Sequence, residues 1–141
     1  ESSTDISPIL PIKTLISDIC DRSILNIKEK FNYREELYVS SLWLAKQTEG
    51  AVLLIHSDTD AGVNEHIIFS AGLYLNDVNI DGELNFPYIK FSYKPNAGEL
   101  VSWPSQPKEY EHEILKVSDT RYNVLLWFTS DKEYDLFNYS A

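Results

Sequence analysis

The feature that most constrains the fold is a series of short β-type segments that fills the chain after Asn32. Most of these segments are rich in residues that favour strands, and glycine, proline, asparagine or aspartate separates them. They span Leu37–Lys46, Ala51–Ile55, Ile67–Leu75, Glu83–Phe86, Tyr88–Tyr93, Glu99–Trp103, Glu111–Val117 and Arg121–Thr129. About eight strands at short, regular spacing are typical of an antiparallel sandwich or jelly roll.

The segment before this series has a different pattern. Residues 1–12 contain two prolines and several small polar residues, so we expect an irregular arm. In residues 13–31 apolar side chains recur at three- and four-residue spacing, which indicates an amphipathic helix or a broken pair of helices. We expect this helical cover to pack on one face of the sheet. With 141 residues, the chain is interpreted as a single domain (1–141) whose β core spans 37–129.

Composition excludes some classes of function. The net charge of −10 argues against a nucleic-acid partner, because phosphate backbones bind basic surfaces. No apolar run approaches the roughly 20 residues of a membrane span, so no membrane partner is expected. No signal peptide is visible, although the chain begins at Glu1 rather than at Met. The single cysteine, Cys20, fits a reducing, cytoplasmic setting, which for a viral protein is the host cytoplasm.

Two potential metal ligands stand at the end of the Ala51–Ile55 run, which is predicted to be a buried strand. His56 and Asp58 are two residues apart, so in a strand their side chains point the same way. His112, on a second strand-like run, is the candidate third ligand. Two imidazoles and one carboxylate that leave coordination positions open are the ligand set of non-haem Fe(II) oxygenases.

Each of these residues also has a plainer interpretation. His56 and Asp58 form a pattern found in many unrelated proteins and can be a hydrogen-bonded pair at a strand end. His112 stands between two glutamates and can be a surface histidine, and Arg121 can be a surface ion-pair residue. For His66 we expect a solvated or locally bonded side chain rather than a ligand.

The three tryptophans, Trp43, Trp103 and Trp127, are expected to be core or cleft-lining residues. Alternation along the last strand places Trp127 on the same face as Arg121, and Trp127 is therefore the best candidate to face an active site.

Several strings, taken in order, decide between these interpretations. Gly50 precedes His56 by six residues, and His112 precedes Arg121 by nine. Between them stand the strings Gly72-Leu73-Tyr74-Leu75-Asn76, Asp81-Gly82-Glu83-Leu84-Asn85-Phe86 and Lys94-Pro95-Asn96-Ala97-Gly98-Glu99-Leu100-Val101. With His56, Asp58 and His112, this order resembles that of the Fe(II)- and 2-oxoglutarate-dependent oxygenases, and most of all their prolyl 4-hydroxylase-like branch, including its minimal viral and bacterial members.

The resemblance implies a mainly β fold, a double-stranded β-helix (jelly roll) with iron at one open end. It implies that His56, Asp58 and His112 bind Fe(II) and take part in catalysis. It also implies that Arg121 and Tyr74 bind the distal carboxylate of 2-oxoglutarate. The chemistry agrees, because a planar guanidinium suits bidentate capture of a carboxylate and is costly to bury without an anion.

The implied activity is that of a dioxygenase that hydroxylates a peptide, prolyl or other, or a small acceptor, while 2-oxoglutarate is decarboxylated to succinate. The implied cofactors are Fe(II), 2-oxoglutarate and O2, with ascorbate as an optional addition. The presence of Asp58 favours hydroxylation over halogenation, because related halogenases lack this carboxylate. The alternative is a jelly-roll binding or structural module with a vestigial metal site. The sequence predicts neither the substrate nor the oligomeric state.

The chain also departs from the family pattern. Gln47 stands where many relatives have a tyrosine that touches 2-oxoglutarate, and Ser70 stands where a threonine is common. Asp81-Gly82 replaces a pair of glycines. These changes affect the contacts expected for the cosubstrate rather than the metal ligands.

Overall fold

The computed structural model describes residues 10–59 and 64–137. Residues 1–9 of the expected arm, most of the expected loop after Asp58 and the last four residues of the tail lie outside this described part. Two compact units divide the chain, residues 1–34 and residues 35–141.

The described residues of the first unit form one α-helix, α1 (Leu10–Lys30). The expectation of an irregular arm up to residue 12 is wrong for its last three residues, because Pro11 is tolerated in the first turn of a helix, where its missing N–H has no helical partner. The helix ends at Lys30, and Asn32, two residues further on, has a left-handed φ of 49°. The Tyr33 N–H then bonds the Lys28 carbonyl at 2.9 Å, which closes the last turn. The expected packing of this helix on the sheet stays a prediction.

Among its described residues, the second unit contains eight strands and three short 3-10 helices. The strands are β1 (Tyr38–Gln47), β2 (Leu53–His56), β3 (Ile67–Tyr74), β4 (Leu84–Phe86), β5 (Phe91–Tyr93), β6 (Leu100–Pro104), β7 (His112–Ile114) and β8 (Arg121–Thr129). The 3-10 helices are η1 (Pro87–Ile89), η2 (Lys108–Tyr110) and η3 (Lys132–Tyr134). All eight predicted strands are present, with shifted ends.

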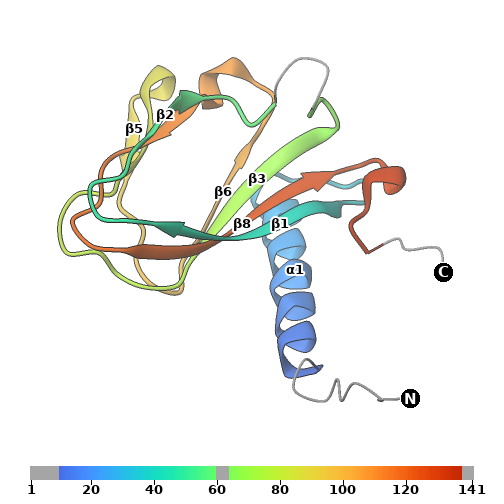
Figure 1. Cartoon of the computed structure of the whole chain (residues 1–141). Coiled ribbons are helices and arrows are strands. Elements are labelled where there is room, and N and C mark those ends of the chain that lie inside the picture. The colour runs from blue at the N-terminus through green and yellow to red at the C-terminus, as the bar shows by residue number, and fades with distance from the viewer. Residues whose placement is uncertain (1–9, 60–63, 138–141) are drawn as a thin grey trace. The chain divides into compact units, whose positions relative to one another are not determined.

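The strands form two antiparallel sheets of four, in the orders β1-β8-β3-β6 and β2-β7-β4-β5. Strands that follow one another in the sequence mostly lie in opposite sheets, which is the winding of a jelly roll (Figure 1). The predicted mainly β, double-stranded β-helix fold is therefore confirmed.

Apolar side chains from both sheets meet between the layers. Leu84 and Phe86 of β4 pack with Trp103 of β6, and the rings of Phe86 and Trp103 meet edge to face at 5.5 Å. This packing holds the two sheets face to face.

Two strand predictions need correction. The Ala51–Ile55 run was expected to be buried, but β2 is an edge strand and Leu54 is 77% exposed. An apolar run with no alternation has the same sequence pattern whether neighbouring elements bury the strand or leave it exposed. The expected strand Tyr88–Tyr93 begins only at Phe91, because Pro87 starts a 3-10 turn that Lys90 ends with a φ of 52°.

Candidate metal centre

Three potential metal ligands converge at the end of β2. His56 and His112 are directly paired across the neighbouring strands β2 and β7. The Asp58 Oδ1 atom lies 3.4 Å from His56 Nε2 and 3.7 Å from His112 Nε2. All three ligand atoms lie within 4.8 Å of one another, so this group could hold a metal ion. The sequence separates Asp58 from His112 widely, and the pairing of β2 with β7 brings them together.

Hydrogen bonds orient both imidazoles. His56 Nδ1 lies 2.9 Å from the Leu54 carbonyl oxygen, and His112 Nδ1 lies 3.0 Å from that of Tyr110. A carbonyl can only accept, so each Nδ1 must carry the hydrogen, and in a neutral ring the lone pair then lies on Nε2. Both lone pairs therefore face Asp58 in the tautomer that a metal ligand needs.

The ionisation of the group also suits a cation. Burial alone would raise the pKa of Asp58, but its contacts with His56, His112 and Ser70 outweigh burial and lower that pKa. Burial lowers the pKa of His112, although Asp58 and the Tyr110 carbonyl oppose this. At neutral pH the site therefore offers one carboxylate and a neutral imidazole, the ligand forms that bind divalent metals.

Trp103 contacts both the Asp58 carboxylate and the His112 ring. Trp103 Nε1–H donates a hydrogen bond to Asp58 Oδ2 at 3.1 Å. The Trp103 ring also meets the His112 ring edge to face at 4.9 Å. The sequence predicted Trp103 only as a core or cleft-lining residue, since its partners are far away along the chain.

A narrow cavity of about 60 Å³ runs inward from the three ligands, between the two sheets. Tyr74 lines it, and the pKa of Tyr74 is raised to about 12, mainly by burial and against the charge of Arg121. The Tyr74 hydroxyl is therefore a hydrogen-bond donor at neutral pH.

Arg121 packs behind Tyr74, with its guanidinium carbon 5.1 Å from the centre of the tyrosine ring. Only 2% of Arg121 is exposed, and Nη1 donates to the Gly82 carbonyl at 2.7 Å. Its Nε and Nη2 groups are buried without a hydrogen-bond partner among the described residues. The alternative of a surface ion pair is therefore wrong, and two donors remain for an anion.

Other predicted residues have structural contacts. His66 lies outside the candidate centre, where it stacks on Tyr134 at 3.8 Å and pairs with the Ser40 hydroxyl, as expected for a locally bonded histidine. Gln47 Nε2 donates to the Ala51 carbonyl at 2.8 Å. It therefore ties together the two ends of the turn between β1 and β2.

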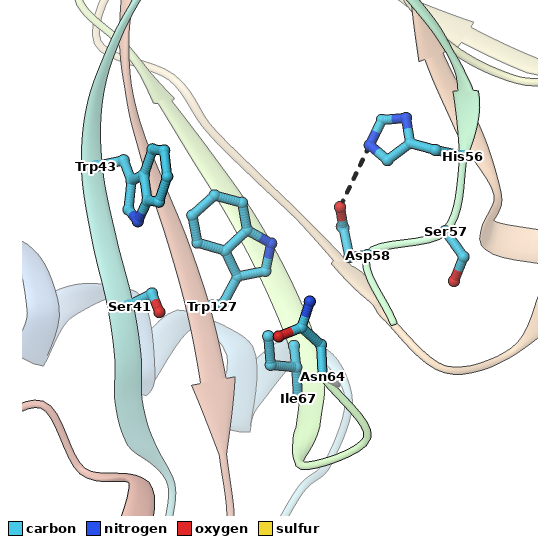
Figure 2. A pocket seen from close by; sticks show the side chains of 8 residues that line it. All are labelled: Ser41, Trp43, His56, Ser57, Asp58, Asn64, Ile67 and Trp127. Carbon is cyan, nitrogen blue, oxygen red and sulfur yellow. Dashed lines mark ion pairs between the residues drawn. The ribbon is translucent and has the colours of Figure 1, made fainter. Parts of the chain in front are cut away.

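A wider cleft of about 320 Å³ opens on the outer side of His56 and Asp58. Trp127 lies on its wall, as strand alternation predicted, together with Trp43 (Figure 2). The sequence did not indicate the contribution of Ser41 and Asn64 to this cleft.

The fold and these three potential ligands are consistent with a non-haem Fe(II) oxygenase, and comparison with known families agrees. Residues 42–129 match the family model of the 2OG-Fe(II) oxygenase superfamily, and the chain belongs to that superfamily. It is therefore a 2-oxoglutarate-dependent enzyme of the family that sequence resemblance indicated. No curated protein matches the chain.

Solved structures include related folds. A viral collagen prolyl hydroxylase from Paramecium Bursaria Chlorella virus-1 is 20% identical with a TM-score of 0.72, over 84% of this chain and 74% of that one. A Burkholderia pseudomallei 2OG-Fe(II) oxygenase family protein is 18% identical with a TM-score of 0.70, over 84% and 58%. A Pseudomonas putida prolyl-4-hydroxylase is 28% identical with a TM-score of 0.59, over 77% and 61%.

The superfamily implies Fe(II) and 2-oxoglutarate as cofactors, and the residues present fit both. Two imidazoles and a carboxylate suit Fe(II), and the unpartnered donors of Arg121 suit a carboxylate.

In the described part of the chain, no helix is long and apolar enough to cross a membrane.

Proposed function

We propose that this chain is an Fe(II)- and 2-oxoglutarate-dependent hydroxylase that acts on a peptide, prolyl or other, or on a small acceptor. The observation that carries the proposal is the convergence of His56, Asp58 and His112 beside a buried arginine whose Nε and Nη2 donors have no partner among the described residues. A binding module with a vestigial site is expected to have lost at least one of these groups, and this chain keeps them all.

Each residue has a defined part in this proposal. His56, Asp58 and His112 would hold Fe(II), and Trp103 would keep the Asp58 carboxylate in place. Arg121 and the Tyr74 hydroxyl would bind the distal carboxylate of 2-oxoglutarate at the inner end of the cavity. When bound, the iron and the cosubstrate supply the oxidising chemistry, with 2-oxoglutarate decarboxylated to succinate and O2 as the oxidant.

The test is succinate formation by the purified chain with Fe(II), 2-oxoglutarate, O2 and a candidate peptide or small acceptor. Wild type should form succinate, and His56→Ala should not. His66→Ala is the matched control, because His66 pairs with Ser40 and Tyr134 outside the centre and its loss should leave the rate nearly unchanged. Background succinate from wild type, equal to that from His56→Ala, would exclude the proposed function. Addition of ascorbate to parallel reactions shows whether it sustains the rate.

A further inference from the structure

Two serine hydroxyls are buried beside the candidate metal centre. Ser70 on β3 is 1% exposed, and Ser105, which directly follows β6, is 3% exposed. Their Oγ atoms lie 2.6 Å apart and form a short hydrogen bond. A buried hydroxyl loses its hydrogen bonds to water, so alanine would occupy these positions at lower cost unless the hydroxyls had a task.

Ser70 lies beside the tryptophan that already contacts Asp58. It stands directly opposite Trp103 in the pairing of β3 with β6. Trp103 Nε1–H donates to Asp58 Oδ2 at 3.1 Å, and the Ser70 hydroxyl is a second hydrogen-bond partner of the same carboxylate. Asp58 follows β2, which belongs to the other sheet. One sheet therefore presents two neighbouring donors to a potential metal ligand carried by the other sheet.

The direction of this hydrogen-bond chain follows from the charge of Asp58. An ionised carboxylate can only accept, so the Ser70 hydroxyl must give its single hydrogen to Asp58. The Ser105 hydroxyl is then the donor in the 2.6 Å bond to Ser70 Oγ. The chain thus runs from Ser105 through Ser70 to Asp58, and each hydrogen bond polarises and strengthens the next one.

The backbone of Ser105 is anchored on two sides. Its carbonyl accepts a hydrogen bond from Thr59 Oγ1 at 3.3 Å, and Ser57 Oγ donates to the same carbonyl at 3.5 Å. These two residues flank Asp58 in the sequence. The Ser105 N–H donates to the Ile68 carbonyl of β3 at 2.9 Å. Ser105 is therefore tied both to the segment that carries Asp58 and to the strand that carries its hydroxyl partner.

We propose that Ser70 and Ser105 are positioning residues, whose two hydroxyls hold the Asp58 carboxylate with one oxygen toward the histidines and the other turned away. This inference rests on the proposed function, in which Asp58 holds Fe(II). A carboxylate held in this way binds a metal through one oxygen and leaves neighbouring coordination positions open. Without the hydroxyls, the carboxylate can turn and bring its second oxygen toward the metal.

Metal binding without turnover tests this inference. Titration calorimetry measures the affinity for Mn(II), and the d–d spectrum of bound Co(II) reports how the metal is coordinated. Ser70→Ala should bind Mn(II) about tenfold more weakly than wild type and shift the Co(II) spectrum, because Asp58 loses a donor. Ser105→Ala should lose about threefold, because it removes only the bond that polarises Ser70 and keeps the backbone contacts of residue 105.

A double variant separates a hydrogen-bond chain from two independent contacts. If Ser105 acts through Ser70, then Ser105→Ala should cause no further loss of Mn(II) affinity in a chain that already carries Ser70→Ala. Ser102→Ala is the matched control. Ser102 is also a buried serine on β6, but strand alternation places its side chain on the face opposite to that of Trp103. This control should keep the wild-type Mn(II) affinity and Co(II) spectrum.

Three results would overturn this inference: wild-type Mn(II) affinity in Ser70→Ala, additive losses in the double variant, or an equal loss in Ser102→Ala. Absence of succinate formation by wild type, together with the expected effects of the serine variants on Mn(II) binding, would instead refute the hydroxylase function. The two failures can therefore be told apart.

Discussion

At the scale of single residues, the candidate centre depends on hydrogen bonds from outside the ligand group. The carbonyls of Leu54 and Tyr110 set the imidazole tautomers, and Trp103 Nε1–H occupies the Asp58 oxygen that does not face the histidines. Such contacts fix a carboxylate in one orientation before a metal arrives, which lowers the cost of assembling the site.

Trp103→Phe should weaken metal binding by about 10- to 100-fold, because it removes the donor to Asp58 but keeps a ring against His112. Titration calorimetry with Mn(II) measures the affinity. The d–d spectrum of bound Co(II) should also shift as the carboxylate reorients, which a purely structural loss would not produce. Trp43→Phe is the control, and equal Mn(II) affinities for the two variants would contradict the assigned role of Trp103.

Tyr74 predicts a pH effect on folding. Its pKa is about 12 in the folded chain, against 10.0 for an ordinary tyrosine, so the hydroxyl resists ionisation only when the protein is folded. Between pH 10 and 12 the unfolded chain therefore loses this proton first, and folding stability must fall as the pH rises. Relative to Tyr74→Phe, wild type should lose about 2–3 kcal/mol across this window, as measured by urea unfolding. Parallel pH profiles for the two proteins would refute the shift.

At the scale of structural elements, the turn before β4 positions Arg121. Gly82 has a φ of 81°, and its carbonyl accepts a hydrogen bond from the guanidinium. A Cβ at this position would lie 2.7 Å from Arg121 Nη2 and 2.9 Å from Val117 Cγ1. This turn therefore needs glycine for its backbone and for the space that the arginine occupies.

Gly82→Ala should lower the free energy of unfolding by about 1–3 kcal/mol more than Gly98→Ala does. Gly98 is the matched control because its φ is 85° and a Cβ there meets nothing within 4 Å, so it carries the backbone cost alone. Urea unfolding measures the difference. N-oxalylglycine should also bind Gly82→Ala more weakly, because the arginine must move. If both alanine variants lose the same stability, the contact with Arg121 is unimportant.

The elements also show what local sequence can and cannot specify. The strands were predictable because turn residues and β-branched runs act locally, and so was the shared direction of His56 and Asp58. The exposure of Leu54 could not be predicted, because the burial of a strand depends on which other strands lie alongside it. The hydrogen bond from Trp103 to Asp58 could not be predicted from local sequence either, since 45 residues separate the two residues.

At the scale of the whole β unit, the two sheets bring together residues that are far apart in the sequence. The sequence alone could connect these residues only through resemblance to a known family. Asp58 and His112 converge because β2 pairs with β7. The inner cavity has walls from both sheets, with Tyr74 from β3 and Leu84 from β4. A ligand that spans this cavity would therefore bind only the folded arrangement, and so should raise its stability.

Mn(II) together with N-oxalylglycine should raise the melting temperature of wild type by several degrees, because a ligand at about 100 times its Kd adds about 2.7 kcal/mol to folding stability. Differential scanning fluorimetry measures the shift. His56→Ala should lose most of it, since a metal ligand is missing. Arg121→Ala removes only the proposed carboxylate contact. Arg121→Ala should therefore keep the shift caused by Mn(II) alone and lose the extra shift caused by N-oxalylglycine. If Arg121→Ala keeps that extra shift in full, the two free guanidinium donors do not bind the cosubstrate, and the role of Arg121 is confined to packing against Tyr74 and Gly82.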